Sequence, residues 1–351
     1  MSKEKVAVYV GRFNAPHNAH AWTYDYALEK YDHLIILVGS AGLARDPRNP
    51  FTFEERKSMI EGIVAPTLAK LRAGGKRKKV SILPVHDYVY DHTKWLTEVQ
   101  LQVSSATTSH DITLVGYEKD STSYYLKFFP QWGKKGAMDV APFHEGYNAT
   151  DVRNAYFTDG TIMRDKLPAA TIEFLEKFRF HQNGELYAYL KEEHDFYENY
   201  KKAASVYPYP PIYVTGDAVV TCAGHILLIT RKHSPGKGLM ALPGGFINQE
   251  ETVEQCILRE LTEETELKVP DGVIARAIRG NITVFDSPTR SLRGRTITHC
   301  GHVVLNDTTL PKVRPGDDAA KAHWVPISKV VTLRDQFFED HYSIISCVLK
   351  L

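Results

Sequence analysis

Near its N-terminus the chain reads Val6-Ala7-Val8-Tyr9-Val10-Gly11-Arg12-Phe13-Asn14-Ala15-Pro16-His17-Asn18-Ala19-His20. The apolar run at its start predicts a buried strand. Gly11 then gives a turn without a side chain, where a phosphate can approach the backbone, and the following helix presents its N-terminal N–H groups. His17 and His20 are three residues apart, so at a helix start they project to one side. The stretch predicts a phosphate-binding loop, although two histidines that only cap the helix remain the alternative.

The alternation of strand and helix continues through the first half. Short β-branched runs lie at residues 34–38, 80–85 and 112–116, and helix-length segments at 20–31, 52–71 and 93–105. Apolar strands separated by helices are typical of βαβ units with a mostly parallel sheet. The sequence therefore predicts an α/β first domain, with ligands at the carboxyl ends of its strands.

The 351 residues exceed one typical domain of roughly 100–200 residues. The run Tyr207-Pro208-Tyr209-Pro210-Pro211 follows a polar, helix-like segment and favours an extended linker. Beyond it, three strands and one helix starting near Glu251 give an α+β pattern, with the strands at 212–221, 225–231 and 297–305. We predict a first domain over residues 1–180, a helical and proline-rich linker over 181–211 and a second domain over 212–351.

Composition and charge exclude several classes of function. The 43 Lys and Arg residues nearly balance 42 Asp and Glu residues, which argues against a nucleic-acid binder. No stretch reaches the ~18–20 apolar residues of a membrane helix, and no signal-peptide core follows Met1. We expect a cytoplasmic protein without nucleic-acid or membrane partners, and formation of a homo-oligomer stays open. The separated cysteines are expected to be buried free thiols: Cys222, Cys256, Cys300 and Cys347.

The motif Gly-Arg-Phe-x-x-Pro-His-x-x-His after a first strand closely resembles the signature of the nucleotidylyltransferase superfamily. More narrowly, it is similar to the archaeal-type nicotinamide mononucleotide (NMN) adenylyltransferases. Later segments resemble further motifs of that family in order: Asn49-Pro50-Phe51, Asp87 with Trp95, Gly116 to Asp120, and Asn148 to Arg153. The resemblance implies a Rossmann-like nucleotidylyltransferase domain, with His17, His20 and Arg153 as catalytic residues. It implies substrate-binding roles for Gly11, Arg12, Phe13, Asn49, Asp87, Trp95, Gly116, Asn148 and Thr150.

Within this family pattern, His17 and His20 contact ATP phosphates, while Asp87 and Trp95 bind the nicotinamide nucleotide. The NMN 5′-phosphate attacks the α-phosphorus of ATP, which forms NAD and releases pyrophosphate. Because this nucleophile is already anionic, catalysis depends on alignment and on neutralising negative charge, with Mg²⁺ expected on the phosphates. We also expect Thr150 to cap the helix that carries Arg153.

A second constellation reads Gly245-x5-Glu251-x7-Arg259-Glu260-Leu261-Thr262-Glu263-Glu264-Thr265-Glu266-Leu267. Spacings of three and four residues place Glu260, Glu263 and Glu264 on one helical face. Like charges there repel one another by about a few tenths of a kcal/mol per pair unless a cation binds. Mg²⁺ and Mn²⁺ suit such oxygen ligands. A solvated acidic helix is the alternative for Glu263 and Glu264 alone.

The whole spacing matches the Nudix box, Gly-x5-Glu-x7-Arg-Glu-aliphatic-x-Glu-Glu-x-Gly-aliphatic, except that Glu266 replaces the terminal glycine. The resemblance implies a C-terminal α+β Nudix fold that cleaves a nucleoside diphosphate linkage. It implies bracing by Glu251 and Arg259, catalytic roles for Glu263 and Glu264, and metal ligands Gly245, Glu260, Glu263 and Glu264. Residues 285–296 resemble a stretch of the ADP-ribose pyrophosphatase branch, which implies diphosphate binding by Arg290 and Arg295, although a solvated loop is the alternative. Asp317 and Asp318 are further candidate ligands or bases.

Together the resemblances predict a bifunctional enzyme that makes NAD from ATP and NMN and hydrolyses ADP-ribose to AMP and ribose 5-phosphate. Two rival interpretations remain. In one, the first domain transfers a nucleotidyl group to a phosphorylated acceptor other than NMN. The Asp87–Trp95 pair argues against this interpretation. In the other, the second domain is a non-catalytic sensor of ADP-ribose, against which the intact box glutamates argue.

Overall fold

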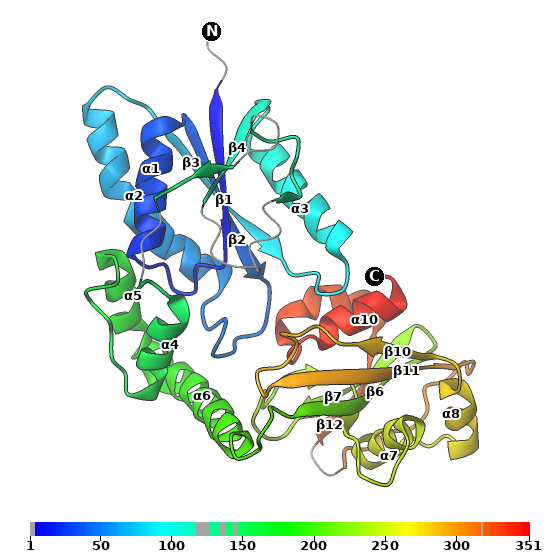
Figure 1. The fold of residues 1–351 in the computed structure, drawn as a ribbon. Coiled ribbons are helices and arrows are strands. Elements are labelled where there is room, and N and C mark those ends of the chain that lie inside the picture. The colour runs from blue at the N-terminus through cyan, green and yellow to red at the C-terminus, as the bar shows by residue number, and fades with distance from the viewer. Residues whose placement is uncertain (1–3, 117–126, 134–137, 143–145, 317–318) are drawn as a thin grey trace. The chain divides into compact units, whose positions relative to one another are not determined.

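The computed structural model describes residues 4–116, 127–133, 138–142, 146–316 and 319–351 (Figure 1). The chain divides into two compact units, one of residues 1–88 and 92–191 and one of residues 89–91 and 192–351. The division at 191/192 falls inside helix α6 (Glu185–Ala204). The predicted linker is therefore largely helical, and its helix contributes to both units.

The first unit is built on a five-stranded sheet of order β3-β2-β1-β4-β5, in which every described pairing is parallel. Alternate side chains of β1 enter two cores: Ala7 and Tyr9 pack with helices α1 and α2, whereas Val6 and Val8 pack with α3. This confirms the predicted α/β domain. The elements are β1 (Lys5–Gly11), α1 (Asn18–Lys30), β2 (His33–Ala41), α2 (Phe53–Ala73), β3 (Lys79–His86), α3 (His92–Ala106), β4 (Asp111–Gly116) and β5 (Asp139–Val140).

A helical layer follows the sheet in the first unit and packs against α2. It consists of α4 (Ala149–Thr158), α5 (Ala169–Phe178), the short 3₁₀ helix η3 (His181–Gly184) and the start of α6. Its core joins Tyr156 and Leu175 to Met59 of α2 and to Ala15 of the loop after β1. This layer therefore supports the loop that carries His17. Neither α2 nor any other helix in the described ranges combines the length and apolarity needed to span a membrane.

Close packing of α2 on α5 depends on Gly62, where an added Cβ would lie 2.7 Å from the Cβ of Ala170. We expect Gly62→Ala to lower the free energy of unfolding by about 1 kcal/mol. Overpacking destabilises the fold by about 1–3 kcal/mol, whereas the higher helix propensity of alanine stabilises it by up to about 1 kcal/mol. Urea denaturation measures this. Gly272→Ala in α8 is the matched control, because a Cβ there meets open space. A Gly62→Ala protein as stable as the parent would contradict the packing argument.

The second unit is a mixed sheet between two helical layers, which confirms the predicted α+β pattern. Its main order is β10-β11-β6-β7-β12, with β8 on β7 and β9 on β6; among the pairings of these strands in the described residues, β6–β11 is parallel and the others are antiparallel. One face packs on α7 and α8, the other on α10. The strands are β6 (Ile212–Cys222), β7 (His225–Arg231), β8 (Met240–Ala241), β9 (Gly244–Phe246), β10 (Ile282–Phe285), β11 (Arg295–Leu305) and β12 (Ala319–Pro326). The helices are α7 (Val253–Thr265), α8 (Asp271–Ile278), α9 (Ile327–Val330), η4 (Val331–Gln336) and α10 (His341–Leu349).

Two segments outside the predicted second domain belong to this unit. The hydroxyl of Tyr90 donates to Oδ2 of Asp340 at 2.5 Å, and its ring lies 4.8 Å from that of Phe285. The buried carboxylate of Glu193 on α6 accepts from the backbone N–H of Gly236 at 2.8 Å. The second unit therefore consists of two separate stretches of sequence, residues 89–91 and 192–351.

The four cysteines differ from the prediction at one position. Cys222, Cys256 and Cys300 are buried free thiols, as expected, whereas Cys347 is a free thiol exposed on α10. The pattern around Cys347 is apolar, but its place on the helix turns it away from the core that Ile344 and Ile345 enter.

Candidate active sites

The loop after β1 is shaped by Phe13, whose ring is 2% exposed and folds back over Gly11. A Cβ on Gly11 would lie 2.7 Å from that ring. Phe13 also has a left-handed backbone, with φ of 52°, and its ring lies 5.3 Å from Tyr9. Gly11 and Phe13 thus pack against each other, and their substrate-binding roles stay a prediction. They fix the path of the loop that carries the polar residues.

His17 and His20 lie together at the start of α1. The backbone N–H of His17, the N-cap, donates to Nδ1 of His20 at 3.1 Å, and the two rings stack with centroids 3.7 Å apart. Capping uses one ring nitrogen of His20, so it is compatible with contact between the imidazoles and a phosphate. The structure brings the predicted pair together at the carboxyl end of β1.

Arg153 on α4 ties two loops together. Its Nε donates to the carbonyl of Pro47 at 3.1 Å, its Nη1 to the carbonyl of Asn14, and its Nη2 to the hydroxyl of Thr150 at 3.2 Å. The side chain is buried. Arg153 is therefore placed where the sequence predicted, but much of its hydrogen bonding positions the loop after β1.

Positive charge accumulates around Arg153. Burial and the nearby guanidinium groups of Arg12 and Arg48 lower the pKa of Arg153 to about 10, and Asp46 opposes that effect. Burial raises the pKa of Asp46 itself. The three guanidinium groups outnumber the carboxyl group of Asp46, so this region favours a bound anion. This is the electrostatic signature of a phosphate site at the carboxyl end of the sheet.

Arg56 is a supporting residue that the sequence showed only as part of a motif. It is 1% exposed, and its Nη1 donates to the carbonyls of Arg12 and Gly39 at 2.6 Å each. Its Nη2 donates to the carbonyl of Ser40 at 3.2 Å, and burial lowers its pKa to about 10. Arg56 thereby fastens the loop after β1 to the end of β2. Its burial could not be read from the sequence, where an arginine on a helix is usually exposed.

The predicted nicotinamide-binding residues lie at the ends of neighbouring elements. Oδ1 of Asp87 accepts from the backbone N–H of Ser40 at 3.2 Å and Oδ2 from its hydroxyl at 2.7 Å, so Asp87 joins β3 to β2. Trp95 on α3 is half-buried, with its ring 6.2 Å from Phe129.

Two further predicted substrate-binding residues lie in loops or at a strand end. Asn49 is buried beside Asn14, at 3.5 Å between side chains. Gly116 ends β4, and residues 117–120 lie outside the described residues.

The helix carrying Arg153 is capped by a different residue from the one expected. Oδ1 of Asn148 accepts from the backbone N–H of Thr150 at 2.9 Å, so Asn148 is the N-cap of α4. The hydroxyl of Thr150 instead accepts from Arg153. Asn and Thr both favour this position, so the sequence alone did not distinguish them.

In the second unit, Arg259 braces the loop before α7 as the box resemblance implied. Its Nε and Nη2 donate to the carboxylate of Glu251 at 2.9 and 2.7 Å. Arg259 holds the pKa of Glu251 down to about 2. Nη2 also donates to the carbonyl of Phe246 at 3.1 Å. This bidentate pair fixes the turn that leads from Gly245 into α7.

The box glutamates surround Gly245 and Arg259. Arg259 Nη1 donates to Glu260 Oε1 at 2.7 Å and to Glu263 Oε2 at 2.9 Å. Glu260 packs so closely on Gly245 that an added Cβ would lie 2.3 Å from its Oε1. Glu264 is buried and accepts from the backbone N–H of Gly244 at 2.9 Å. The predicted ligands are thus assembled around one turn.

Within the described ranges no three His, Cys, Asp or Glu side chains converge closely enough to hold a metal ion. The donor set nevertheless fits a divalent cation. Burial, with Glu260 and Asp217 nearby, raises the pKa of Glu264 to about 8, and burial also raises the pKa of Glu260. Carboxylates that destabilise one another gain from a cation. Glu263 is 43% exposed and forms an ion pair with Arg259, so a bound cation would compete with Arg259 for its carboxylate.

Asp217 and Arg231 were missed by the sequence reasoning. Asp217 on β6 is buried behind Gly244 and accepts from the hydroxyl of Thr298; burial raises its pKa to about 6. Arg231 ends β7 near Glu264 and lies 4.3 Å from the ring of Phe338. The available signal was positional, since Arg231 directly follows a buried strand and precedes the turn toward the box.

The arginines of the 290–295 loop are placed differently from the prediction. Arg290 is buried, and its Nε and Nη2 donate to Asp340 at 3.0 and 2.9 Å, so it is a structural ion pair and not a solvated group. Arg295 donates to the carbonyl and carboxylate of Asp286. Arg293 lies 5.0 Å from the ring of Phe246 and forms an ion pair with Glu339. Asp317 and Asp318 lie outside the described residues.

Glu266 ends α7 in the left-handed conformation, with φ of 41° and ψ of 38°, at the position where the box has glycine. We expect Glu266→Gly to raise the free energy of unfolding by about 1 kcal/mol. A left-handed backbone costs about 1–2 kcal/mol for a residue with a Cβ, and glycine removes that cost. Glycine also loses more conformational entropy on folding, which offsets part of the gain. Urea denaturation of Glu266→Gly and Glu266→Ala separates backbone strain from loss of charge. Equal stability of the two variants would contradict the explanation.

Comparison with known families agrees with both constellations. A model of the cytidylyltransferase-like family matches residues 8–154, and a model of the NUDIX domain matches residues 213–346. The two matches cover the loop after β1 and the box helix α7, so the two resemblances found in the sequence are confirmed.

Individual relatives match each half and then the whole chain. The nicotinamide/nicotinic acid mononucleotide adenylyltransferase of Acinetobacter baylyi is 34% identical over 195 residues, which is 55% of this chain and 95% of the relative. The ADP-ribose pyrophosphatase of Methanocaldococcus jannaschii is 35% identical over 132 residues, 38% of this chain and 71% of the relative. A crystal structure from Francisella tularensis, of a bifunctional NMN adenylyltransferase/ADP ribose pyrophosphatase complexed with AMP and a manganese ion, matches with a TM-score of 0.87 at 34% identity over 99% of both chains. This chain therefore belongs to the family of bifunctional NMN adenylyltransferase/ADP-ribose pyrophosphatase proteins.

Proposed function

We propose that the first unit transfers AMP from ATP to NMN, forming NAD and pyrophosphate. The observation that carries this proposal is the cluster of Arg12, Arg48 and Arg153 at the carboxyl end of β1, beside the paired imidazoles of His17 and His20. These groups bind and orient the triphosphate. Asp87 and Trp95 are the proposed contacts of the nicotinamide nucleotide.

The reaction needs alignment more than proton transfer. The attacking phosphate oxygen of NMN is anionic, so no side chain has to remove a proton. The arginines and histidines offset negative charge that spreads over the α-phosphoryl group and the departing pyrophosphate. Arg56 and Arg153 keep those groups in place by holding the loop backbone. Magnesium on the phosphates would supply additional charge neutralisation when bound.

A panel of phosphorylated acceptors tests the proposed substrate. With ATP and Mg²⁺, NMN should give NAD and pyrophosphate with a kcat/KM at least about tenfold above that of phosphopantetheine or glycerol 3-phosphate, a difference of about 1.4 kcal/mol in transition-state binding. Transfer of AMP or CMP to another acceptor at higher kcat/KM would overturn NMN as the substrate.

We propose that the second unit hydrolyses ADP-ribose to AMP and ribose 5-phosphate. Gly245, Glu260, Glu263 and Glu264 would hold Mg²⁺ or Mn²⁺. A bound divalent cation would polarise the diphosphate and lower the pKa of attacking water. The proposed contacts of the diphosphate are Arg231, which lies near Glu264 and the ring of Phe338, and Arg293, which lies beside the ring of Phe246.

Titrating metal into the protein separates a hydrolase from a sensor. ADP-ribose turnover should be absent in EDTA and should return with Mg²⁺ or Mn²⁺, with AMP and ribose 5-phosphate formed in equal amounts. Tight binding of ADP-ribose in Mg²⁺ without any turnover would identify the second unit as a binding module.

A further inference from the structure

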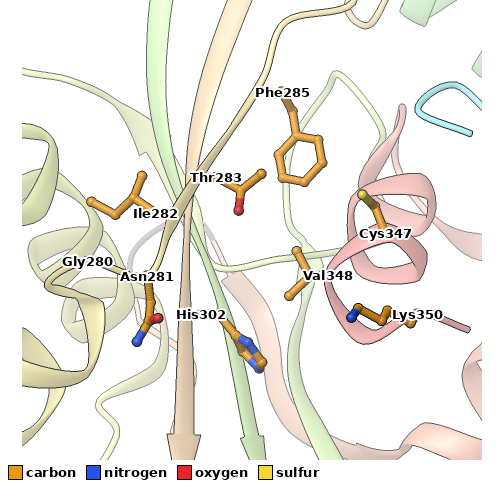
Figure 2. Close-up of a pocket in the computed structure, with 9 residues that line it drawn as sticks. All are labelled: Gly280, Asn281, Ile282, Thr283, Phe285, His302, Cys347, Val348 and Lys350. Atoms are coloured by element: carbon orange, nitrogen blue, oxygen red, sulfur yellow. The ribbon is translucent and has the colours of Figure 1, made fainter.

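A cavity of about 340 Å³ opens on the second unit between the edge strand β10 and helix α10. Figure 2 shows Thr283 and Phe285 on the side of β10 that faces Cys347 and Val348 of α10, whereas Ile282 points to the opposite side. His302 of β11 lies on the same side as Thr283, below it in the view. The cavity therefore lies in the layer between the sheet and α10.

This position separates the cavity from the Nudix box. Successive residues of a strand point to opposite faces of a sheet. Gly301 faces Ile257 of α7, since an added Cβ there would lie 3.4 Å from that side chain. The next residue, His302, points to the other face. None of the box glutamates lines the cavity, so its ligand is not the diphosphate of the hydrolase reaction.

The volume limits the ligand to a small molecule. Ligand pockets usually enclose about 300–1,000 Å³, and this one lies near the lower limit. A dinucleotide such as NAD or ADP-ribose would not be enclosed. A single ring or a short branched chain with one polar group fits the space, with Phe285 and Val348 as apolar walls.

The charge of the lining selects for an anion. The nine lining residues include the cation Lys350 and no aspartate or glutamate. The neutral polar groups are the amide of Asn281, the hydroxyl of Thr283 and the imidazole of His302. A single ammonium group matches one negative charge, which favours a monocarboxylate over a doubly charged phosphate ester.

His302 forms one wall of the cavity. Its Nε2 is buried, and within the described part of the chain it has no hydrogen-bond partner. Such an atom costs about 1–3 kcal/mol unless a ligand or water satisfies it. Nε2 has no surface exposed to the cavity, and burial lowers the pKa of His302, so the neutral ring contributes a wall to the site and not a hydrogen bond from this atom.

We propose that this cavity binds a small monocarboxylate, with its apolar body against Phe285 and Val348 and its carboxylate at Lys350. The site is separate from both proposed active sites, so its occupancy is measured without reference to either reaction. The lining supplies a built-in reporter, because Cys347 is an exposed free thiol whereas Cys222, Cys256 and Cys300 are buried.

The test follows alkylation of Cys347 in the full-length protein by iodoacetamide, an uncharged reagent, with mass spectrometry of the modified peptide. At four times its Kd, benzoate should slow this alkylation about fivefold, because protection follows 1 + [ligand]/Kd. Benzyl alcohol, the neutral molecule of similar shape, and inorganic phosphate should each slow it less than about twofold at the same concentration. Cys347→Ser gives the background from the buried thiols.

Two variants test the assigned contacts. Lys350→Gln should reduce benzoate protection to below about twofold, since the matching charge is lost, and Thr283→Val should change it less. Both positions lie at the surface of the cavity, and circular dichroism confirms that each variant is folded. Absence of protection by benzoate, equal protection by benzyl alcohol or phosphate, or full protection in Lys350→Gln would each overturn the proposal.

Discussion

Replacing His20 by alanine is expected to lower NAD synthesis by a factor on the order of 10², because a preorganised contact with transition-state charge is lost. ADP-ribose hydrolysis should stay unchanged, since the box lies in the other unit. The measurement is the rate of NAD formation from saturating ATP and NMN, with ADP-ribose turnover of the same preparation as the internal control.

The structure adds a second effect that the test must separate. His20 accepts a hydrogen bond from the N–H of His17, so alanine also removes half of a capping box, worth about 0.5–2 kcal/mol of stability. His20→Gln keeps an acceptor at this position but not the imidazole. Recovery of NAD synthesis in His20→Gln would show that His20 acts only through the cap. Unchanged synthesis in a folded His20→Ala protein would remove it from the mechanism.

Glu264→Gln is expected to lower ADP-ribose hydrolysis by a factor on the order of 10², because the proposed metal site loses a full charge while keeping its oxygen. Higher Mg²⁺, or Mn²⁺, which binds such sites more tightly, should restore part of the activity. The Gln oxygen can still accept from the N–H of Gly244, so the fold is retained. The unfolding free energy without metal should not fall, since a neutral amide replaces an acid in a buried, repelling cluster.

Glu254→Gln is the matched control on the same helix. Glu254 is not part of the box; it lies in the first turn of α7, exposed and 4.0 Å from Arg279. Its loss should leave hydrolysis within about twofold, as expected for an exposed ion pair. If Glu264→Gln turns over ADP-ribose like the parent protein at limiting Mg²⁺, the glutamates do not form a working metal site.

The parts of the fold that sequence predicted best are those with strong periodicity. The apolar runs at 6–10 and 34–38 are buried on both faces, which is why they read as continuous and lie at the centre of the parallel sheet. The short strands β8 and β9 were not predicted, because two or three residues are too few to show an alternation of apolar and polar side chains. Their pairing is set by β6 and β7, and not by local preference.

For the candidate site too, the sequence predicted residues that are close along the chain and missed contacts between residues that are far apart. Motif spacing located His17, His20, Glu260 and Glu264, which lie on single helices where residues three or four apart are neighbours. Spacing could not show that Phe13 turns back over Gly11, because a left-handed residue reverses the chain locally. It also gave no sign that Arg290 reaches Asp340, 50 positions along the chain; both the predicted diphosphate contact and the alternative of a solvated loop left that ion pair out.

The segment at residues 89–91 has a consequence for how the gene can be divided. The chain passes between the units at 88/89, at 91/92 and at 191/192, so a single cut does not separate them. A fragment beginning at Ile212, the boundary suggested by the proline-rich run, would lack both Tyr90 and Glu193. Asp340 would lose a hydroxyl donor, and the N–H of Gly236 its carboxylate acceptor. A fragment designed to express the second unit alone should therefore begin before Glu192. It would also need a substitute for the hydroxyl of Tyr90, because that residue lies about a hundred positions earlier in the chain.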